Sequence, residues 1–348
     1  MLAVADQLGR RAAEGYDKQL YSDLFSCIRY LGQTDLPASI KKNHEFLEHI
    51  RTAMDASQNV NDKAELYDQY KRALFYSAPY VFDDYLLAVE FDRPLEKKFY
   101  QPRRHYLRPM VQGYQDILDG KLDLLTLSLP KRAGKSQVGI NFALMLSGRN
   151  PDRASLMEGA GDDLITSFYK GCLEYLMDTE NYHFYDIFPD APIIETNAKL
   201  KIVNLQRQKR FPTIMCRSID ASQVGLSEAT NLLYLDDCVQ SREEAKNRQR
   251  LDDKWETIRG DVMGRAIEGT PIVATGTRYS LYDPIGRLQE YADSQHKRWR
   301  AIEIPALDPI TDESNYEYVR EGKRVFTTAF FREQRELLSA EQFESEFQ

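Results

Sequence analysis

The chain has 348 residues, of which 42% are hydrophobic and 29% charged, and its formal net charge is −8. These values indicate a globular protein with one large domain and appendages, or with two domains. We expect no membrane span, since no apolar stretch approaches the roughly 20 residues that a membrane helix requires, and the negative charge confines any nucleic-acid contact to a local patch.

Residues 1–95 are predicted to form a helical N-terminal region. Apolar side chains recur there at steps of three and four residues, the period of an amphipathic helix. Loops are expected at 33–37 and 57–62, where polar residues and a proline interrupt the pattern. The apolar residues with this spacing are Leu20, Leu24, Ile28 and Leu31, followed by Phe46, Ile50 and Met54.

From about residue 96, short apolar segments alternate with helical ones. This alternation is typical of a mostly parallel sheet covered by helices on both faces. Strands are predicted at 123–129, 154–157, 201–205, 213–217, 231–235, 271–275 and 300–304.

Helices are expected between several of these strands. One spans 135–146 and ends near Gly148, and another spans 163–177. A third begins at Ser241, whose spacing to Glu244 fits a capping box, and carries an apolar stripe. Asp283 before Pro284 predicts the start of a fourth. The stripe of the third helix consists of Leu251, Trp255, Ile258 and Val262.

The four cysteines are widely separated and form no CxxC pair. This spacing argues against a zinc site and against a disulfide scaffold, so we expect reduced thiols. The N-terminus has no charged region followed by an apolar block, so we expect no signal peptide and a cytosolic location. The cysteines are Cys27, Cys172, Cys216 and Cys238.

A phosphate-binding loop is predicted at 129–136, where an apolar strand meets Gly134-Lys135-Ser136 at the start of a helix. The glycine allows close backbone approach, the lysine reaches the β and γ oxygens of a nucleotide, and the serine hydroxyl can ligate Mg²⁺. Gln137 follows in the same helix start and is included among the expected nucleotide-binding residues. Leu129 occupies the first glycine position of the full P-loop pattern, and a lysine that only begins a surface helix is the alternative.

An Asp236-Asp237 pair follows the apolar run 232–235. A hydrolytic P-loop requires one carboxylate to hold Mg²⁺ and a second to orient or deprotonate the attacking water. Asp236 is the expected metal ligand and Asp237 the expected catalytic residue, and the spacing allows this strand to lie beside the first one after a crossover. An Asp-Asp turn that merely closes a strand is the alternative.

Thr275 ends the next predicted strand, 271–275, and Thr277 follows it in Gly276-Thr277-Arg278. Hydroxyl groups at a strand end of a parallel sheet are well placed to sense the γ-phosphate, although both can instead satisfy backbone groups at a turn.

The phosphoryl group in the transition state needs cations beyond the loop lysine. Lys131 and Arg132 are candidates within the loop. Gln101 in the segment 100–104 is a candidate contact for adenine, with a solvated loop as the alternative. Candidates for a cation contributed across a subunit boundary are Arg149, Arg153 and Arg278.

These elements, in this order, resemble the large terminase subunit, the DNA-packaging motor ATPase of tailed bacteriophages and prophages. The resemblance covers roughly residues 95–348. The segments that carry it are Tyr100-Gln101-Pro102-Arg103-Arg104, 128–136, Cys216-Arg217-Ser218-Ile219-Asp220, 232–237 and 277–288.

The resemblance implies a P-loop NTPase core of the RecA-like type at 96–290 and a small lid subdomain at 291–348, after the helical region 1–95. It implies that ATP and Mg²⁺ are cofactors and that Lys131 or Arg132 serves as the family's basic residue in cis. The family often has glutamate where this chain has Asp237. The chain stops about where the nuclease domain of the family begins, so we expect no nuclease activity.

The resemblance also implies partners: double-stranded DNA, a portal protein, the small terminase subunit, and further copies of the chain in a ring on the capsid, in the cytoplasm of the bacterial host. Two basic clusters are candidates for DNA phosphate contact, although each can be a solvated face. They are Lys199, Lys201, Arg207, Lys209 and Arg210, and Arg242, Lys246, Arg248 and Arg250.

Two other functions remain open. A P-loop phosphotransferase would use the same phosphate cradle on a small acceptor, although no arginine-rich lid surrounds an acceptor pocket. An assembly scaffold would bind nucleotide only structurally and dock through its helical N-terminal third.

Overall fold

The computed structural model describes residues 1–206, 208–220, 227–239, 241–280 and 282–347. The chain divides into two compact units, Met1–Phe91 and Asp92–Gln348. None of the described helices combines the length and the apolar character that crossing a bilayer demands. A separate subdomain at 291–348 stays a prediction.

The first unit consists of helices, as its sequence period predicts. Asp17 and Asp35 cap α2 and α3 by accepting hydrogen bonds from backbone N–H groups three residues later. The apolar stripe is buried at Leu24, Ile28 and Phe46, where the helices pack on one another. The helices are α1 (Leu2–Ala12), α2 (Lys18–Leu31), α3 (Leu36–Ala56), α4 (Val60–Ser77) and α5 (Phe82–Ala88).

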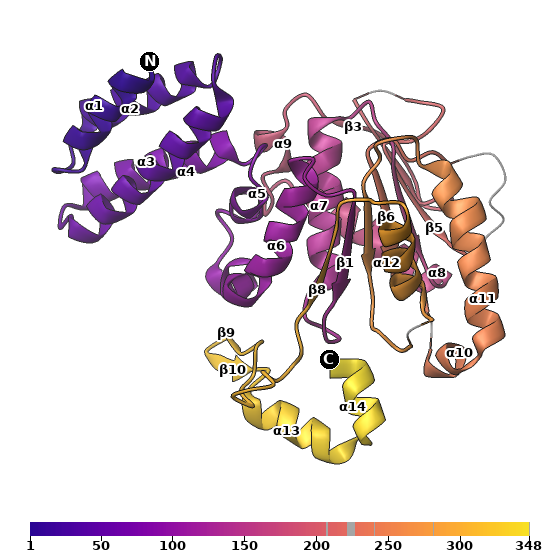
Figure 1. Cartoon of the computed structure of the whole chain (residues 1–348). Helices are drawn as coiled ribbons and strands as arrows, with labels where there is room; N and C mark the ends of the chain where they lie inside the picture. Colours follow the sequence, from indigo (N-terminus) through magenta and orange to yellow (C-terminus); the bar gives the residue numbers. More distant parts are fainter. Residues whose placement is uncertain (207, 221–226, 240, 281, 348) are drawn as a thin grey trace. The chain divides into compact units, whose positions relative to one another are not determined.

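The second unit is built on an eight-stranded, mostly parallel sheet flanked by helices, so the predicted α/β fold class is confirmed (Figure 1). Its strand order is β3-β4-β5-β2-β6-β7-β1-β8, and only β3 and β4 pair in antiparallel fashion with their neighbours. The strands are β1 (Leu124–Ser128), β2 (Ser155–Gly159), β3 (Ile193–Asn197), β4 (Ile202–Leu205), β5 (Ile214–Ser218), β6 (Leu232–Asp236), β7 (Ile272–Thr275) and β8 (Trp299–Glu303).

One prediction about strand order is wrong. β6, which ends at Asp236, does not lie beside β1, because β7 pairs with both strands and separates them. In this register Thr275 lies opposite Asp236 on one side and opposite Leu127 on the other. The threonine therefore lies between the strand of the phosphate loop and the strand of the paired aspartates.

Helices cover both faces of the sheet. On one face α6, α7 and α8 pack on β1, β6 and β2, and on the other face α11 and α12 pack on an apolar cluster that includes Leu233, Leu235 and Ala274. The helices of this unit are α6 (Arg104–Leu118), α7 (Lys135–Arg149), α8 (Asp162–Met177), α9 (Phe184–Ile187), α10 (Arg242–Lys246), α11 (Arg248–Thr257), α12 (Pro284–Ser294), α13 (Thr328–Leu337) and α14 (Ala340–Phe347).

Several predicted boundaries are correct and others are not. Ser241 and Asp283 cap α10 and α12 as expected, by accepting hydrogen bonds from backbone N–H groups. The helix predicted from Ser241, however, is broken at Asn247, which adopts an extended conformation and caps α11. α7 ends at Arg149, next to Gly148, as expected. The predicted apolar stripe of the third helix is buried.

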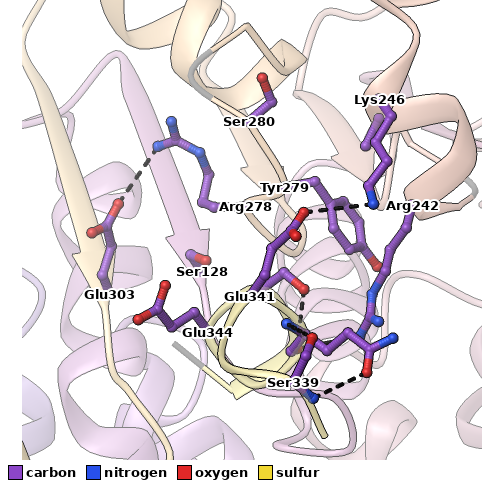
Figure 2. Close-up of a pocket in the computed structure, with 13 residues that line it drawn as sticks. Ser128, Arg242, Lys246, Arg278, Tyr279, Ser280, Glu303, Ser339, Glu341 and Glu344 are labelled. Carbon is purple, nitrogen blue, oxygen red and sulfur yellow. Dashed lines mark hydrogen bonds and ion pairs between the residues drawn. The ribbon is translucent and has the colours of Figure 1, made fainter.

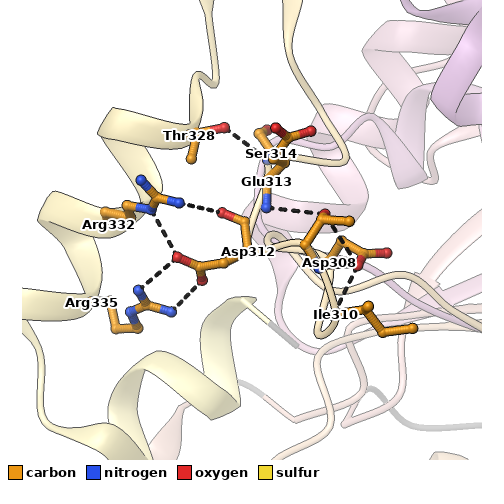
Figure 3. Close-up of polar contacts among 9 residues, drawn as sticks. Asp308, Ile310, Asp312, Glu313, Ser314, Thr328, Arg332 and Arg335 are labelled. Atoms are coloured by element: carbon orange, nitrogen blue, oxygen red, sulfur yellow. Dashed lines mark hydrogen bonds and ion pairs between the residues drawn. The ribbon is translucent and has the colours of Figure 1, made fainter.

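The segment after β8 contains elements that the apolar pattern did not predict. A two-stranded antiparallel hairpin, β9 (Tyr318–Arg320) and β10 (Lys323–Val325), precedes α13. Figure 3 shows Arg332 and Arg335 of α13 meeting the carboxylate of Asp312, at 2.8 and 2.7 Å. This network ties the loop before the hairpin to the helix after it.

Candidate active site

The phosphate loop has the local structure that its sequence predicts. β1 ends at Ser128, and α7 begins at Lys135 directly after Gly134. Gly134 has a φ of 101°, in the left-handed region, and a Cβ there would lie 2.9 Å from the ring of Phe99. Only glycine fits this position without strain. No side chain caps α7, so its first N–H groups remain available to an anion.

Lys135 lies within the loop with only 6% of its surface exposed. Its Nζ donates a hydrogen bond of 2.7 Å to the carbonyl oxygen of Leu129, at the start of the loop. Burial lowers the pKa of the Lys135 ammonium, and the charges of Asp237 and Asp236 act in the opposite direction. The ammonium thus lies in the field of both carboxylates and is held against the loop backbone.

Asp236 is a buried carboxylate at the end of β6. Thr275 Oγ1 donates a hydrogen bond of 2.5 Å to its Oδ1, whereas its buried Oδ2 has no hydrogen-bond partner among the described residues. Burial and the charge of Asp237 raise the pKa of Asp236 to about 6, and the hydroxyl groups of Thr275 and Ser136 act in the opposite direction. The structure therefore brings Asp236 together with the serine of the phosphate loop.

Asp237 turns the chain directly after β6 and has a φ of 37°, which is unusual for a residue other than glycine. Its N–H donates to the Thr275 carbonyl at 2.9 Å, and its Oδ1 accepts a hydrogen bond of 3.3 Å from the N–H of Thr277. A strained backbone that is held by its neighbours is common at functional sites. Thr275 and Thr277 thus contact the two aspartates, and their role as sensors of the γ-phosphate stays a prediction.

Sequence reasoning missed a layer of buried hydroxyl groups behind Asp236. Tyr234 precedes Asp236 by two residues on the same face of β6, and its hydroxyl contacts Thr275 Oγ1 at 3.4 Å and the Tyr114 hydroxyl at 3.5 Å. A Cβ at Gly139 would lie 2.1 Å from the Tyr234 hydroxyl, so α7 approaches β6 closely at this glycine. The alternation of side chains along β6 was the available signal for Tyr234.

The two loop cations are more exposed than Lys135. The side chain of Lys131 is 53% exposed, and its Nζ forms an ion pair of 3.3 Å with Glu346 of α14. Arg132 is exposed and has a φ of 66°. The same loop therefore combines a buried cation with two cations that side chains or ligands from outside the loop can reach.

The remaining arginine candidates lie in different places. Arg278 forms an ion pair of 3.0 Å with the buried Asp283, so it is engaged within its own chain. Arg149 ends α7, and Arg153 precedes β2, so both lie near the amino ends of the strands, opposite the phosphate loop. A role for either arginine within this chain's own site is therefore not supported by its position.

Among the described residues, the side chains of Gln101 and Gln137 form hydrogen bonds with residues outside the phosphate loop. Gln101 is exposed in a short 3₁₀ turn, and its side chain accepts a hydrogen bond of 3.3 Å from Lys98. It lies two residues after Phe99, whose ring packs on Gly134. Gln137 donates to the Tyr175 hydroxyl of α8 at 3.0 Å. Their expected contacts with a nucleotide stay predictions.

The predicted basic clusters are largely paired with acidic side chains. Lys201 contacts Asp162 at 2.7 Å, and Lys209 contacts Asp152 at 3.3 Å. Arg207 lies outside the described residues. In the second cluster the ion pairs join Arg242 to Glu346, Lys246 to Glu341, and Arg248 to Asp252.

A cavity of about 610 Å³ adjoins the end of β1 (Figure 2). On one side the cavity is lined by Ser128, by Arg242 and Lys246 of α10, and by Arg278. On the opposite side α14 contributes polar and acidic side chains, including Glu341 and Glu344. Within the described ranges, no three histidine, cysteine, aspartate or glutamate side chains gather where they could hold a metal ion.

No protein-family model matches the sequence, and a search of the curated proteins finds no match. Among solved structures, the fold is similar to the large terminase of bacteriophage HK97, with a TM-score of 0.53 and 11% sequence identity. The match covers 76% of this chain and 54% of that terminase chain, so this chain spans about half of its length. The chain therefore has a terminase-like α/β fold.

Proposed function

We propose that this chain is a magnesium-dependent ATPase, the motor domain of a viral large terminase. The observation that carries the proposal is the convergence of the phosphate loop and Asp236. Lys135 and Ser136 begin α7, and the buried Asp236 carboxyl at the end of β6 lies close enough to this helix start for the Ser136 hydroxyl to lower its pKa and for its charge to act on Lys135. A surface helix that only began with lysine would have no reason to place its serine at a buried carboxylate.

The triphosphate of ATP would bind along the loop. The uncapped N–H groups of α7 face the anion, and Lys135 would exchange its hydrogen bond with the Leu129 carbonyl for one with a phosphate oxygen. This exchange also gives the buried ammonium a negatively charged partner, which compensates for its desolvation. Lys131 and Arg132 are exposed cations that can stabilise charge on the transferred phosphoryl group.

The side chains around Asp236 fit a magnesium ion. Its Oδ2 is buried without a hydrogen-bond partner among the described residues, and Ser136 supplies a second oxygen. Such oxygen donors are the ligands that Mg²⁺ prefers when it binds through one or two protein groups and substrate phosphates. When bound, the ion supplies positive charge to the phosphate oxygens.

Asp237 is the candidate for orienting the attacking water. The turn after β6 holds its backbone against Thr275, and its carboxylate accepts a hydrogen bond from the Thr277 N–H. Asp237 would accept the proton of the water as the bond to the terminal phosphate breaks. Thr275 donates to Asp236 and lies between the loop strand and β6, so it couples the two halves of the site.

In a terminase, hydrolysis would drive double-stranded DNA into a procapsid. The likeness to the HK97 large terminase and the ordered motifs support this assignment. It implies a ring of copies on a portal protein, with the small terminase subunit as a further partner.

ATP turnover by the full chain with and without Lys135→Ala tests the proposal. The variant should lose at least a hundredfold in turnover, because a phosphate-loop lysine acts on the transition state, while its circular dichroism spectrum and unfolding midpoint stay close to those of the parent. Equal turnover by both proteins would refute the ATPase assignment.

Product analysis with γ-labelled ATP separates hydrolysis from transfer. Free labelled phosphate, stimulated by double-stranded DNA, supports the motor, whereas a labelled acceptor supports a phosphotransferase. Nucleotide binding without turnover, even with DNA and portal present, favours a scaffold.

A further inference from the structure

Helix α14 meets the rest of the second unit through two chemically different faces. Its buried side chains, Phe343 and Phe347, stack on each other at 5.1 Å, and Phe347 also contacts Phe331 of α13 at 5.6 Å. The Phe347 carbonyl accepts a hydrogen bond of 2.6 Å from the N–H of Ala306. The apolar face of α14 thus packs on the segment that follows β8.

The other face of α14 is acidic: Glu341 and Glu344 line the cavity beside α10 (Figure 2), and Glu346 reaches Lys131 of the phosphate loop. Glu346 Oε1 forms ion pairs with both Lys131 and Arg242, and Arg242 also donates to the Gln342 carbonyl at 3.2 Å. Glu341 pairs with Lys246 at 3.6 Å. Arg242, Lys246, Glu341 and Gln342 line the cavity of about 610 Å³, so charged contacts cross it between α10 and α14.

Two cations from different elements thus converge on one carboxylate oxygen. Lys131 belongs to the phosphate loop and Arg242 to the start of α10, and Glu346 pairs with both. A carboxylate held by two cations occupies the kind of environment that a phosphate group prefers. A nucleotide triphosphate carries more charge than one glutamate and would compete for the same cations.

The ion pair between Lys131 and Glu346 is weak enough for this competition, whereas the Arg242–Glu346 pair is less exposed, with side-chain exposures of 27% and 22%. The Lys131 side chain is 53% exposed, and exposed ion pairs contribute little because water and salt screen them. The phenylalanine contacts lie on the side of α13 and need not break when Glu346 leaves the cations.

We propose that Glu346 is an internal competitor of the nucleotide triphosphate: its carboxylate occupies Lys131 and Arg242, and a bound phosphate group displaces it and releases α14 from the core. This inference rests on the proposed function, because it assigns the ligand of the phosphate loop. It adds a phosphate-contacting role for Arg242 and makes α14 the element that responds to nucleotide.

The test compares Glu346→Gln with Glu344→Gln in the full chain. Glu344 lines the same cavity, loses the same charge on substitution, and has no ion pair to a described residue. Binding of a non-hydrolysable ATP analogue with Mg²⁺ is measured by equilibrium titration, and hydrogen exchange is measured at the amides of α14. Lys135→Ala is included to show that the analogue binds at the phosphate loop.

Glu346→Gln should tighten binding of the analogue roughly three- to tenfold, the effect expected when weak ion pairs no longer compete. It should also speed exchange in α14 without nucleotide, and the analogue should speed this exchange in the parent chain. Glu344→Gln should change the affinity less than about twofold. The advantage of Glu346→Gln should shrink as salt is raised.

Different failures have different meanings. Equal affinities of Glu346→Gln and Glu344→Gln, with binding that still depends on Lys135, would overturn this inference and leave the ATPase proposal intact. The same holds if the analogue binds the parent chain without changing exchange in α14. Absence of Lys135-dependent binding in every protein would overturn both.

Discussion

The two ends of the phosphate loop hold their lysines in opposite ways. Lys135 is buried, donates to the Leu129 carbonyl and lies in the field of Asp236 and Asp237. Lys131, four residues earlier, is half-exposed and pairs with Glu346, more than 200 residues away. A few residues of backbone thus separate a cation fixed by packing from one held by a replaceable ion pair.

This difference indicates that the two lysines have different roles. Buried charges are expensive to change, because water cannot take the place of a lost partner. Exposed pairs are weak and salt-sensitive, so they can open and close. We call Lys135 and Asp236 the buried half of the site and Lys131 the exposed half. Substitutions in the buried half and at its half-buried neighbour Asp237 should have large effects, and those in the exposed half should modulate activity.

The largest effect is expected from Asp237→Asn. An amide cannot accept the proton of the attacking water, so hydrolysis should fall by about 10²–10⁴. The Thr277 N–H can still donate to the amide oxygen, so nucleotide binding should persist. Single-turnover hydrolysis and analogue binding, measured on the same preparation, test the loss of hydrolysis and the persistence of binding. Near-normal hydrolysis would remove Asp237 from the catalytic role.

Asp236→Asn should stabilise the chain in the absence of Mg²⁺. The pKa of Asp236 is about 6 in the folded chain and near 3.8 otherwise, so the folded state binds its proton more tightly. Stability therefore falls as the pH rises between about 4 and 6, and the charged form costs about 3 kcal/mol at neutral pH. The free energy of unfolding of the variant should therefore exceed that of the parent by most of this amount at pH 7.5 and by less at pH 4.5.

Urea unfolding at both pH values, with and without Mg²⁺, measures this effect. Magnesium should stabilise the parent chain and not Asp236→Asn, since the amide is a poorer ligand for the ion. A variant that is equally or less stable than the parent at pH 7.5 would contradict the burial argument.

More of the buried half of the site than of the exposed half could be predicted from the sequence. An apolar strand before Gly134-Lys135-Ser136 and another before Asp236 are local patterns, and local hydrogen bonding and burial suffice to form them. The position of β7 between these strands was missed, because strand order depends on contacts distant in sequence. The edge strand β3 was missed as well, although its side chains alternate between exposed and half-buried positions.

The exposed half could not be predicted from sequence. No local pattern links Lys131 or Arg242 to Glu346, since their pairing depends on where α13 places α14. The apolar period of α14 is short, and a run of glutamates on a helix is usually a solvated face.

Gly139→Ala should destabilise the buried half through packing. A methyl group there would lie 2.1 Å from the Tyr234 hydroxyl, so α7 or β6 must shift, at about 1–3 kcal/mol. The shift would also move Ser136 relative to Asp236, and the apparent affinity for Mg²⁺ should weaken. Gly260→Ala is the control, because nothing lies within 4 Å of its Cβ position. If the two variants were equally stable, close packing of α7 on Tyr234 would be disproved.

The smallest effect is expected from Lys131→Arg. Lys131 meets Glu346 through a single contact to one oxygen, so an arginine can replace it as a point charge, and turnover should stay within about threefold of the parent. Lys131→Ala should lower turnover more, since it removes a cation from the phosphate, and Arg132→Ala shows whether the neighbouring residue performs this role. Steady-state kinetics at low and high salt distinguish these cases. A loss on Lys131→Arg as large as that on Lys131→Ala would mean that the exposed lysine is held as strictly as Lys135, and the contrast between the two ends of the loop would no longer hold.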